Sequence, residues 1–198
     1  MDRVEKLFFV DVETTGVDSN QNALTQVAGD VCIINESKEL QSLETFNFDI
    51  QPWEGAVIEP EALKVTGKTE EEIMAYPSSE SVYKEFVALL DRHCNKFDKK
   101  DKMVMLGYNV RFDEDYLRKW FERQGNPYIG SYFWYPPIDI MNLAMFDIGT
   151  KRSRLVNFKL GTVAANYGLT PDGKLHDAMA DIKLTKDLFW TLVKRKYK

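Results

Sequence analysis

Two acidic residues stand two positions apart at the end of a short apolar run. Residues 7–10 predict a buried strand, and Asp11 and Glu13 follow it directly. Because residues i and i+2 of a strand point to the same face, both carboxyl groups project together from the end of the strand. Neighbouring carboxylates repel each other, and a bound cation or a proton relieves that repulsion. The pair indicates a cation site, although a solvated strand end explains it equally well.

A second polar group follows another apolar run. Residues 103–108 predict a buried strand, Asn109 ends it, and Asp113 falls in the first turn of the helix that follows. Acidic residues are common in first turns because the helix dipole favours them, and this explains Asp113 without any site. The junction between strand and helix is nevertheless where open α/β sheets place their ligand crevices.

The third group lies near the end of the chain. Asp177 predicts a helix N-cap, which puts Asp181 about one turn inside the helix and His176 just outside it. The other histidine of the sequence, His93, lies near the end of an amphipathic helix and is predicted to be a surface residue or a residue of the last helical turn. His176 lies in a loop between acidic residues, where a core histidine is not expected, and it is therefore a candidate for chemistry.

In chain order these groups are D-x-E-T, N-x-x-F-D and H-D-x-x-x-D, an order that resembles the DEDDh family of 3′→5′ exonucleases. The resemblance runs from Leu7 to about Leu192, and residues 58–67 resemble a segment of polymerase proofreading subunits. It implies a ribonuclease-H-like sheet and the hydrolysis of nucleotides from 3′ ends. The sister branch of the family has Tyr at the position of Asp177, so the resemblance is to the His branch. The implied catalytic residues are four carboxylates and one general base: Asp11, Glu13, Asp113, Asp181 and His176.

The resemblance also implies two divalent cations, Mg²⁺ or Mn²⁺. By resemblance, Asp11 bridges both ions, Glu13 and Asp181 complete the first, and Asp113 supports the second. Hard oxygen ligands suit these cations, whereas zinc prefers His and Cys ligands. Two such ions clamp the attacking and leaving oxygens of a phosphodiester, and their charge favours the neutral form of the His176 imidazole as a base.

Substrate contacts are carried over from the family in the same way. The predicted substrate-binding residues are Thr14, Thr15, Leu63, Thr66 and Asn109. The sequence departs from the family at two places, since Tyr108 and Thr66 stand where His is frequent. Two further segments have alternative interpretations. The aromatic residues within 128–135 could stack on bases or pack in the core, and the basic residues within 151–154 could contact phosphates or form a solvated surface.

Composition limits the classes of protein to which this chain can belong. Its 198 residues predict one domain over residues 1–198, with 26 basic and 31 acidic residues and a net charge of −5. This acidity argues against broad wrapping of duplex nucleic acid. The apolar runs are too short for a membrane span, and charged residues within 1–6 predict no secretory signal. Cys32 and Cys94 indicate reduced thiols of an intracellular protein, which we expect in the cytoplasm.

The predicted elements give an α/β fold with a mixed sheet. Strands over residues 7–10, 25–35 and 43–50 predict an antiparallel three-strand meander, and strands over 103–108 and 137–141 add parallel pairing. Helices are expected over 59–76, 81–97, 112–123, 158–167 and 177–197. The helix over 59–76 is interrupted at 65–68 and restarts at a capping box of Thr69 and Glu72. The prediction is a ribonuclease-H-like sheet covered by helices.

The predicted function is a metal-dependent 3′→5′ exonuclease that acts on single-stranded DNA in proofreading or end trimming. The first alternative is the same chemistry on RNA 3′ ends, as in RNase T-like members of the family. The second is a nucleic-acid-binding or polymerase-binding subunit on a decayed nuclease fold, although such a copy should have lost at least one of the five catalytic side chains. A polymerase is a further expected partner, and because the chain ends soon after its last helix, it would have to bind the folded domain.

Overall fold

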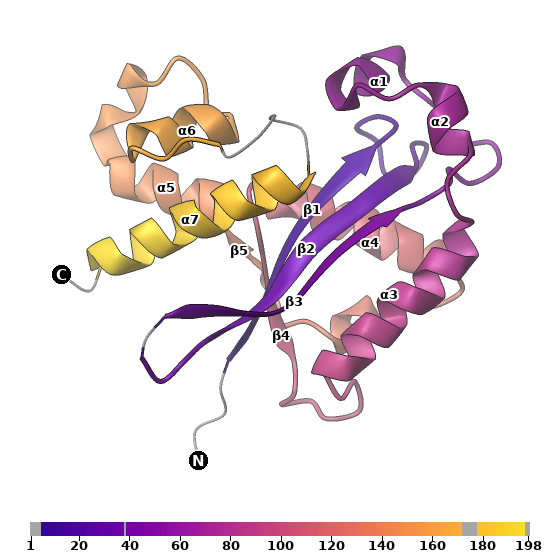
Figure 1. The fold of residues 1–198 in the computed structure, drawn as a ribbon, viewed down its shortest axis with the longest axis horizontal. Coiled ribbons are helices and arrows are strands. Elements are labelled where there is room, and N and C mark those ends of the chain that lie inside the picture. Colours follow the sequence, from indigo (N-terminus) through magenta and orange to yellow (C-terminus); the bar gives the residue numbers. More distant parts are fainter. Residues whose placement is uncertain (1–4, 38, 172–177, 197–198) are drawn as a thin grey trace.

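The computed structural model describes residues 5–37, 39–171 and 178–196. In this part of the chain one sheet contains five strands in the order β3-β2-β1-β4-β5 (Figure 1). The strands are β1 (Lys6–Thr14), β2 (Leu24–Ile34), β3 (Leu40–Asp49), β4 (Met103–Gly107) and β5 (Ile138–Asp139). The first three pair antiparallel, while β1 with β4 and β4 with β5 pair parallel. The predicted meander and the predicted parallel strands are both confirmed.

The central strand β1 is buried on both faces. Phe8 and Val10 belong to the core on one side of the sheet, and Leu7 and Phe9 belong to the core on the other. A strand covered on both faces forms a continuous apolar run instead of an alternating one, which is why residues 7–10 carry no polar side chain. Odd and even positions of β1 therefore face different groups of helices.

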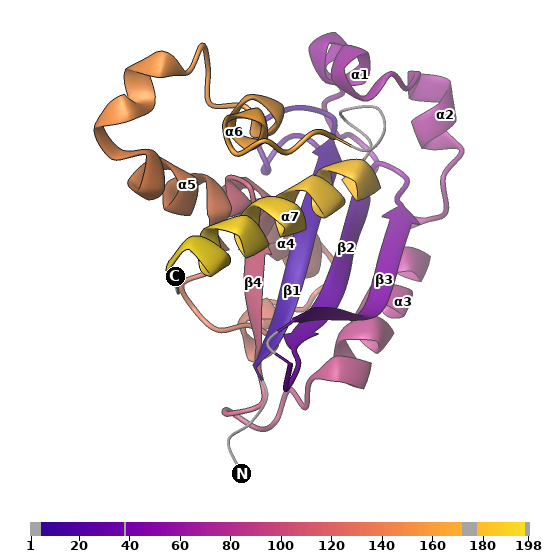
Figure 2. The same ribbon diagram turned by 60° about the vertical axis from the view of Figure 1, so that its left-hand side comes forward.

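The helices form a layer on each face of the sheet. Helices α3 (Ser79–His93) and α4 (Val110–Arg123) cover the face of Phe8, whereas α5 (Ile140–Ile148), α6 (Leu160–Asn166) and α7 (Ala178–Lys196) cover the face of Phe9 (Figure 2). The remaining helical segments are α1 (Pro60–Thr66), α2 (Glu70–Met74), η1 (Ile129–Ser131) and η2 (Gly149–Arg154). Within the described residues, none of the helices combines the length and apolar character that crossing a bilayer requires.

Element boundaries differ from the predictions at several places. The predicted capping box is confirmed, because the Thr69 side chain accepts from the Glu72 N–H and the Glu72 carboxylate accepts from the Thr69 N–H. Helix α3 ends at His93, before the predicted 97, and α4 begins at 110. The strand predicted over 137–141 is short, because Asp139 accepts a 2.9 Å hydrogen bond from the N–H of Met141 and caps a helix there. Helix α5 was not predicted.

Candidate active site

Strand β1 carries the first two carboxyl groups. Asp11 and Glu13 occupy odd positions, so they continue the face of Phe9 and point toward the side of the sheet that α7 covers. Val12, between them, is buried on the opposite face. The pairing of β1 with β2 shifts register after Glu13. The strand thus presents both carboxyl groups where its regular pairing ends.

A tight approach of β4 to β1 places the second motif beside the first. A Cβ atom at Gly107 would lie 2.9 Å from the carbonyl oxygen of Val10, so only glycine fits the end of β4. Asn109 then adopts a left-handed conformation with φ 62°, which Asn tolerates better than most residues. Helix α4 starts at the next residue and brings Asp113 to β1 in its first turn.

Asp113 is almost completely buried, with 3% of its surface exposed. Its Oδ1 accepts a 3.0 Å hydrogen bond from the backbone N–H of Val12. This bond ties the carboxyl group of the second motif to the strand that carries the two carboxyl groups of the first. Two segments that are distant in sequence are therefore joined at one end of the sheet.

Helix α7 supplies the fourth carboxyl group. Asp181 lies in its first turn, and the helix packs across β1 and β2. A partly buried ion pair holds this helix to the sheet, because the Lys186 ammonium contacts the buried carboxylate of Asp30 on β2. The Ser42 hydroxyl also donates a 2.6 Å hydrogen bond to Asp30. Sheet and helix are thus connected close to the turn that carries Asp181.

These four carboxyl groups line one pocket of about 590 Å³. Its lining residues come from the ends of β1 and β4, from the first turns of α4, α5 and α7, and from the segment that leads into α6. Figure 2 shows how these elements are arranged around the sheet. The rest of its lining mixes aromatic, apolar and polar residues: Val12, Tyr108, Asn109, Phe112, Met141, Phe158, Lys159 and Leu160.

Burial and repulsion from neighbouring carboxylates raise the pKa of two of these carboxyl groups, Asp11 and Asp113. Burial raises the pKa of Asp11 well above its ordinary value, and the charges of Asp113, Glu13 and Asp181 raise it further. Burial raises the pKa of Asp113 to about 8, although hydrogen bonds from its own N–H and that of Val12 act in the opposite direction. A bound cation would offset both the cost of burying the charge and the repulsion between neighbouring carboxylates, since it stabilises the ionised carboxylates.

The donor set fits a hard divalent cation. All four groups offer carboxylate oxygens, the ligands that Mg²⁺ and Mn²⁺ prefer. Among the described residues, no three His, Cys, Asp or Glu side chains are grouped so that they could hold a metal ion. Mg²⁺ is usually held by one or two carboxylates together with water and substrate phosphates. The arrangement therefore suits such an ion better than one that needs a closed protein cage.

The predicted substrate-binding residues are only partly brought together. Asn109 lines the pocket, whereas Thr14, Leu63 and Thr66 do not. The Thr14 hydroxyl donates a 2.6 Å hydrogen bond to the carbonyl of Gly16. Leu63 and Thr66 lie on α1, which forms a separate flank above the end of β1 (Figure 1).

Thr15 is not placed to contact a nucleotide. It is completely buried, and its hydroxyl donates to the carbonyl of Val57 at 2.7 Å and accepts from the N–H of Ala23 at 2.7 Å. Its own N–H donates to the carbonyl of Ala23. Thr15 therefore holds the loop after β1 against the segment before α1, and this corrects the expectation of a substrate contact.

His176 and Asp177 lie outside the described residues, so the predicted general base and helix cap stay predictions. The other histidine is placed as predicted near a helix end, in the last turn of α3. There His93 Nε2 lies 2.6 Å from a carboxylate oxygen of Glu44. Neither residue lines the pocket.

Several residues of the site have no clear sequence signal. Asp139 at the end of β5 accepts a 3.1 Å hydrogen bond from the N–H of Asn109 and so holds the junction before α4. In the sequence, Asp139 falls in the middle of the strand predicted over residues 137–141, a position that does not indicate this contact. Phe158 and Lys159 come from an irregular segment before α6, and only the structure places them in the pocket.

Tyr108 has a defined role in the site. Its hydroxyl donates a 2.6 Å hydrogen bond to the carbonyl oxygen of Phe158. Burial raises the pKa of Tyr108 above its ordinary value, and the nearby charge of Asp139 acts in the same direction, so the phenol stays protonated and remains a donor. Tyr108 stands where the resembled family often has His, and its hydroxyl holds the Phe158 segment in the lining of the pocket.

Known proteins resemble this chain over almost its whole length. A family model described as exonuclease matches residues 8–189. The chain is 30% identical over 188 residues to ribonuclease T of Histophilus somni, a match that covers 93% of this chain and 81% of that protein. It is 27% identical over 195 residues to ribonuclease T of Klebsiella pneumoniae, covering 94% of this chain and 83% of that one.

Solved structures of E. coli exonuclease I share the fold. The complex with a dT13 oligonucleotide matches with a TM-score of 0.73 at 23% identity and covers 96% of this chain and 41% of exonuclease I. A zinc-bound form of its complex with single-stranded DNA gives a TM-score of 0.74 at 22% identity, with coverages of 98% and 41%. The chain spans about two fifths of exonuclease I, and the likeness confirms the predicted ribonuclease-H-like fold.

Proposed function

This chain belongs to the exonuclease family, and we propose that it releases nucleoside monophosphates from the 3′ end of single-stranded DNA. The family and its ribonuclease T relatives support a 3′→5′ exonuclease. The observation that carries the proposal is the pocket into which β1, α4 and α7 direct Asp11, Glu13, Asp113 and Asp181.

Enzymes of this family generally depend on divalent metal ions, and we assign two Mg²⁺ or Mn²⁺ ions to the four carboxylates. Asp11, Glu13, Asp113 and Asp181 would hold these ions through their carboxylate oxygens, together with water and substrate phosphates. When bound, such ions supply a hydroxide-like nucleophile near neutral pH and stabilise the charge on the attacking and leaving oxygens.

The protein groups have separate tasks in this scheme. His176 accepts the proton of the attacking water, the usual work of a general base. The Val12 N–H keeps the Asp113 carboxylate oriented, because it bonds one of its oxygens. Asn109 contributes polar lining, and Phe112 and Met141 contribute apolar lining against the terminal nucleotide.

The pocket is large enough for a terminal nucleotide. Its volume of about 590 Å³ lies within the range of roughly 300–1,000 Å³ that is usual for small-ligand pockets. The exonuclease I structures are complexes with single-stranded oligonucleotides, and in line with them we expect slower action on blunt duplex than on single strands.

RNA is the second candidate substrate, because the relatives named above are ribonucleases. The two substrates differ at the 2′-hydroxyl, which a protein senses through hydrogen bonds at the sugar. We keep single-stranded DNA as the main proposal, in line with the oligonucleotide complexes of exonuclease I. A polymerase partner and a cytoplasmic location stay predictions from the sequence.

The test compares 5′-labelled DNA and RNA oligonucleotides of one sequence with Mg²⁺. We expect a ladder that shrinks from the 3′ end, faster for DNA, and no reaction with a 3′-phosphate or with the Asp11→Asn variant. Faster degradation of RNA would make RNA the main proposed substrate and DNA the alternative. Cleavage of a circular single strand at a rate near that of the linear strand would overturn the exonuclease assignment, because a circle has no end.

A further inference from the structure

A positively charged segment borders the acidic pocket. Residues 149–159, which we call the basic arm, contain four basic side chains and no acidic one: Lys151, Arg152, Arg154 and Lys159. The chain as a whole has a net charge of −5, so this concentration of positive charge is a local feature. Against the described residues, none of the four forms an ion pair within 4.0 Å.

The basic arm is anchored within its length and just beyond its last residue, and it is exposed between these two points. Leu155 and Leu160 pack against the core on the side of α5, α6 and α7, whereas Val156 between them is exposed. The hydrogen bond from the Tyr108 hydroxyl to the Phe158 carbonyl adds a third attachment, at the wall of the pocket. The arm is therefore held in place beside the carboxylates and presents its side chains to solvent.

Phe158 and Lys159 extend from the basic arm into the pocket lining. The Phe158 ring is 41% exposed, and the Arg152 guanidinium lies 5.3 Å from its centroid. Lys159 is the basic residue among the described residues that line the pocket. An exposed aromatic ring with a guanidinium beside it, followed in the sequence by a lysine of the pocket lining, offers a stacking surface for a base together with contacts for phosphates.

We propose that the basic arm binds the nucleotides immediately 5′ of the scissile bond, with Phe158 stacking on a base and Arg152 and Lys159 contacting phosphates. This rests on the proposed function. The 3′ end of the substrate terminates inside the pocket, so the part of the strand that leaves the pocket is its 5′ side. That side carries the phosphates and bases that this segment complements in charge and shape.

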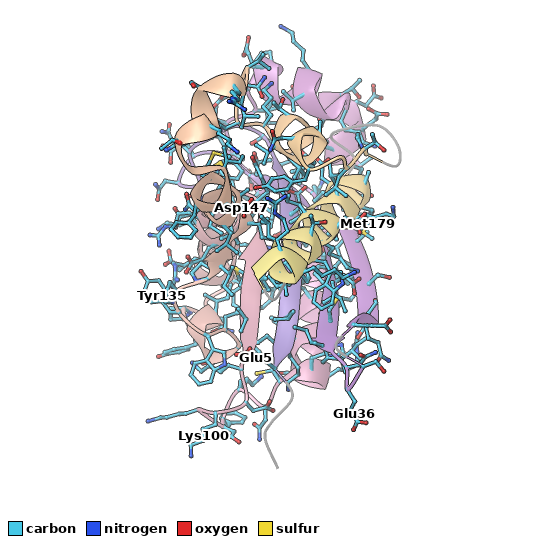
Figure 3. The ribbon with its side chains drawn as sticks, turned by 90° about the vertical axis from the view of Figure 1, so that its left-hand side faces the viewer. Glu5, Glu36, Lys100, Tyr135, Asp147 and Met179 are labelled. Carbon is cyan, nitrogen blue, oxygen red and sulfur yellow. The ribbon has the colours of Figure 1, made fainter. Side chains whose placement is uncertain are left out.

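The test uses two double variants that remove the same charge. Arg152→Gln with Lys159→Gln changes the basic arm, and Lys99→Gln with Lys100→Gln is the matched control, because Lys100 projects at the opposite end of the molecule (Figure 3). Binding of a labelled oligothymidylate is measured in EDTA at several salt concentrations. Each lost phosphate contact lowers the logarithmic salt slope by about 0.7, so the arm variant should lose about 1.4 and the control nothing.

Kinetic measurements on two substrates separate binding of the strand from hydrolysis in the pocket. The nitrophenyl ester of thymidine 5′-monophosphate has no upstream nucleotides, so its hydrolysis with Mg²⁺ reports the pocket itself. We expect the Arg152→Gln/Lys159→Gln variant to lose much more kcat/KM on the oligonucleotide than on the ester. Phe158→Ala should weaken oligonucleotide binding roughly 5- to 150-fold, the range for one base stack, and Phe158→Tyr should restore it.

Equal losses on oligonucleotide and ester would overturn the proposal, as would equal losses in the arm variant and the lysine control. An unchanged salt slope in the arm variant would overturn it too. A wild-type protein that hydrolyses neither substrate would instead refute the proposed function, and the binding curves in EDTA would still decide whether the basic arm holds single strands.

Discussion

The backbone N–H of Val12 donates a 3.0 Å hydrogen bond to Oδ1 of Asp113, across a separation of 101 residues in the sequence. One peptide group of β1 therefore orients the carboxylate that α4 carries. Because Val12 lies between Asp11 and Glu13, the same bond sets the spacing of the first and second motifs. The four-carboxylate pocket depends on this hydrogen bond between the end of β1 and the start of α4.

Asp113→Asn should abolish most of the hydrolysis and leave the fold intact. The amide oxygen can still accept from Val12, but the charge that a cation needs is gone, so we expect at least about a 100-fold loss of kcat. Asp115→Asn is the matched control, because Asp115 lies on the same helix and is exposed. Without metal, the melting temperature of Asp113→Asn should rise near pH 7, because burial raises the pKa of Asp113 to about 8 and the variant no longer has to take up a proton on folding. Wild-type activity in this variant would contradict the assignment.

His176→Ala should lower kcat by about 10²–10⁴-fold, the usual contribution of a positioned general base. Binding of Mn²⁺, measured by titration calorimetry, should be unchanged because this residue is not assigned as a ligand. The limb of the pH–rate profile that reports the imidazole should disappear in the variant. A parallel collapse of Mn²⁺ affinity would instead make His176 a metal ligand.

Tyr108→Phe should raise the KM for an oligonucleotide several-fold, with a smaller change of kcat. The variant keeps the ring and removes only the hydroxyl that holds the Phe158 carbonyl, a bond worth about 0.5–1.5 kcal/mol. Tyr167→Phe is the control, because its hydroxyl bonds Asp147 at 2.8 Å, away from the pocket. The role of Tyr108 would be refuted by equal effects of both substitutions.

Lys186→Met should lower the free energy of unfolding by about 3 kcal/mol, because it leaves the buried Asp30 carboxylate without its cation. Lys183→Met on the same helix removes an exposed pair with Asp187 and should cost less than about 1 kcal/mol. Urea unfolding of both variants measures the difference. Similar costs would show that the pair between Lys186 and Asp30 does not hold α7 to the sheet.

Glu44→Gln should destabilise the protein slightly near pH 7 and not at all in strong acid. A hydrogen bond from Arg92, and next one from His93, lowers the pKa of Glu44 below its usual 4.5. A carboxyl group with a lowered pKa contributes stability above its unfolded pKa and loses it as the pH falls through the folded value. The pair is largely exposed, so we expect less than about 1 kcal/mol from urea unfolding at pH 7. A difference between variant and wild type that grows toward pH 3 would contradict this.

Local patterns were enough to predict much of the fold. The apolar runs at residues 7–10 and 103–108 and the capping box at Thr69 are short-range features, and short-range rules describe them. Helix α5 escaped prediction because it is apolar almost throughout, without the polar face that makes a helix visible in a sequence. The strand before it is correspondingly shorter than its apolar residues suggest.

The sequence by itself determined the chemical character of this protein: which carboxylates it carries, in what order, and that Asp11 and Glu13 share one face of a strand. Tertiary structure alone decided which side chains meet. Thr14 and Thr15 are equivalent in the sequence, yet the Thr15 hydroxyl is buried between Ala23 and Val57. Phe158 and Lys159 reach the pocket through the Tyr108 hydroxyl and the packing of α6. Hydrogen bonds between distant segments settle such contacts, and no local periodicity encodes them.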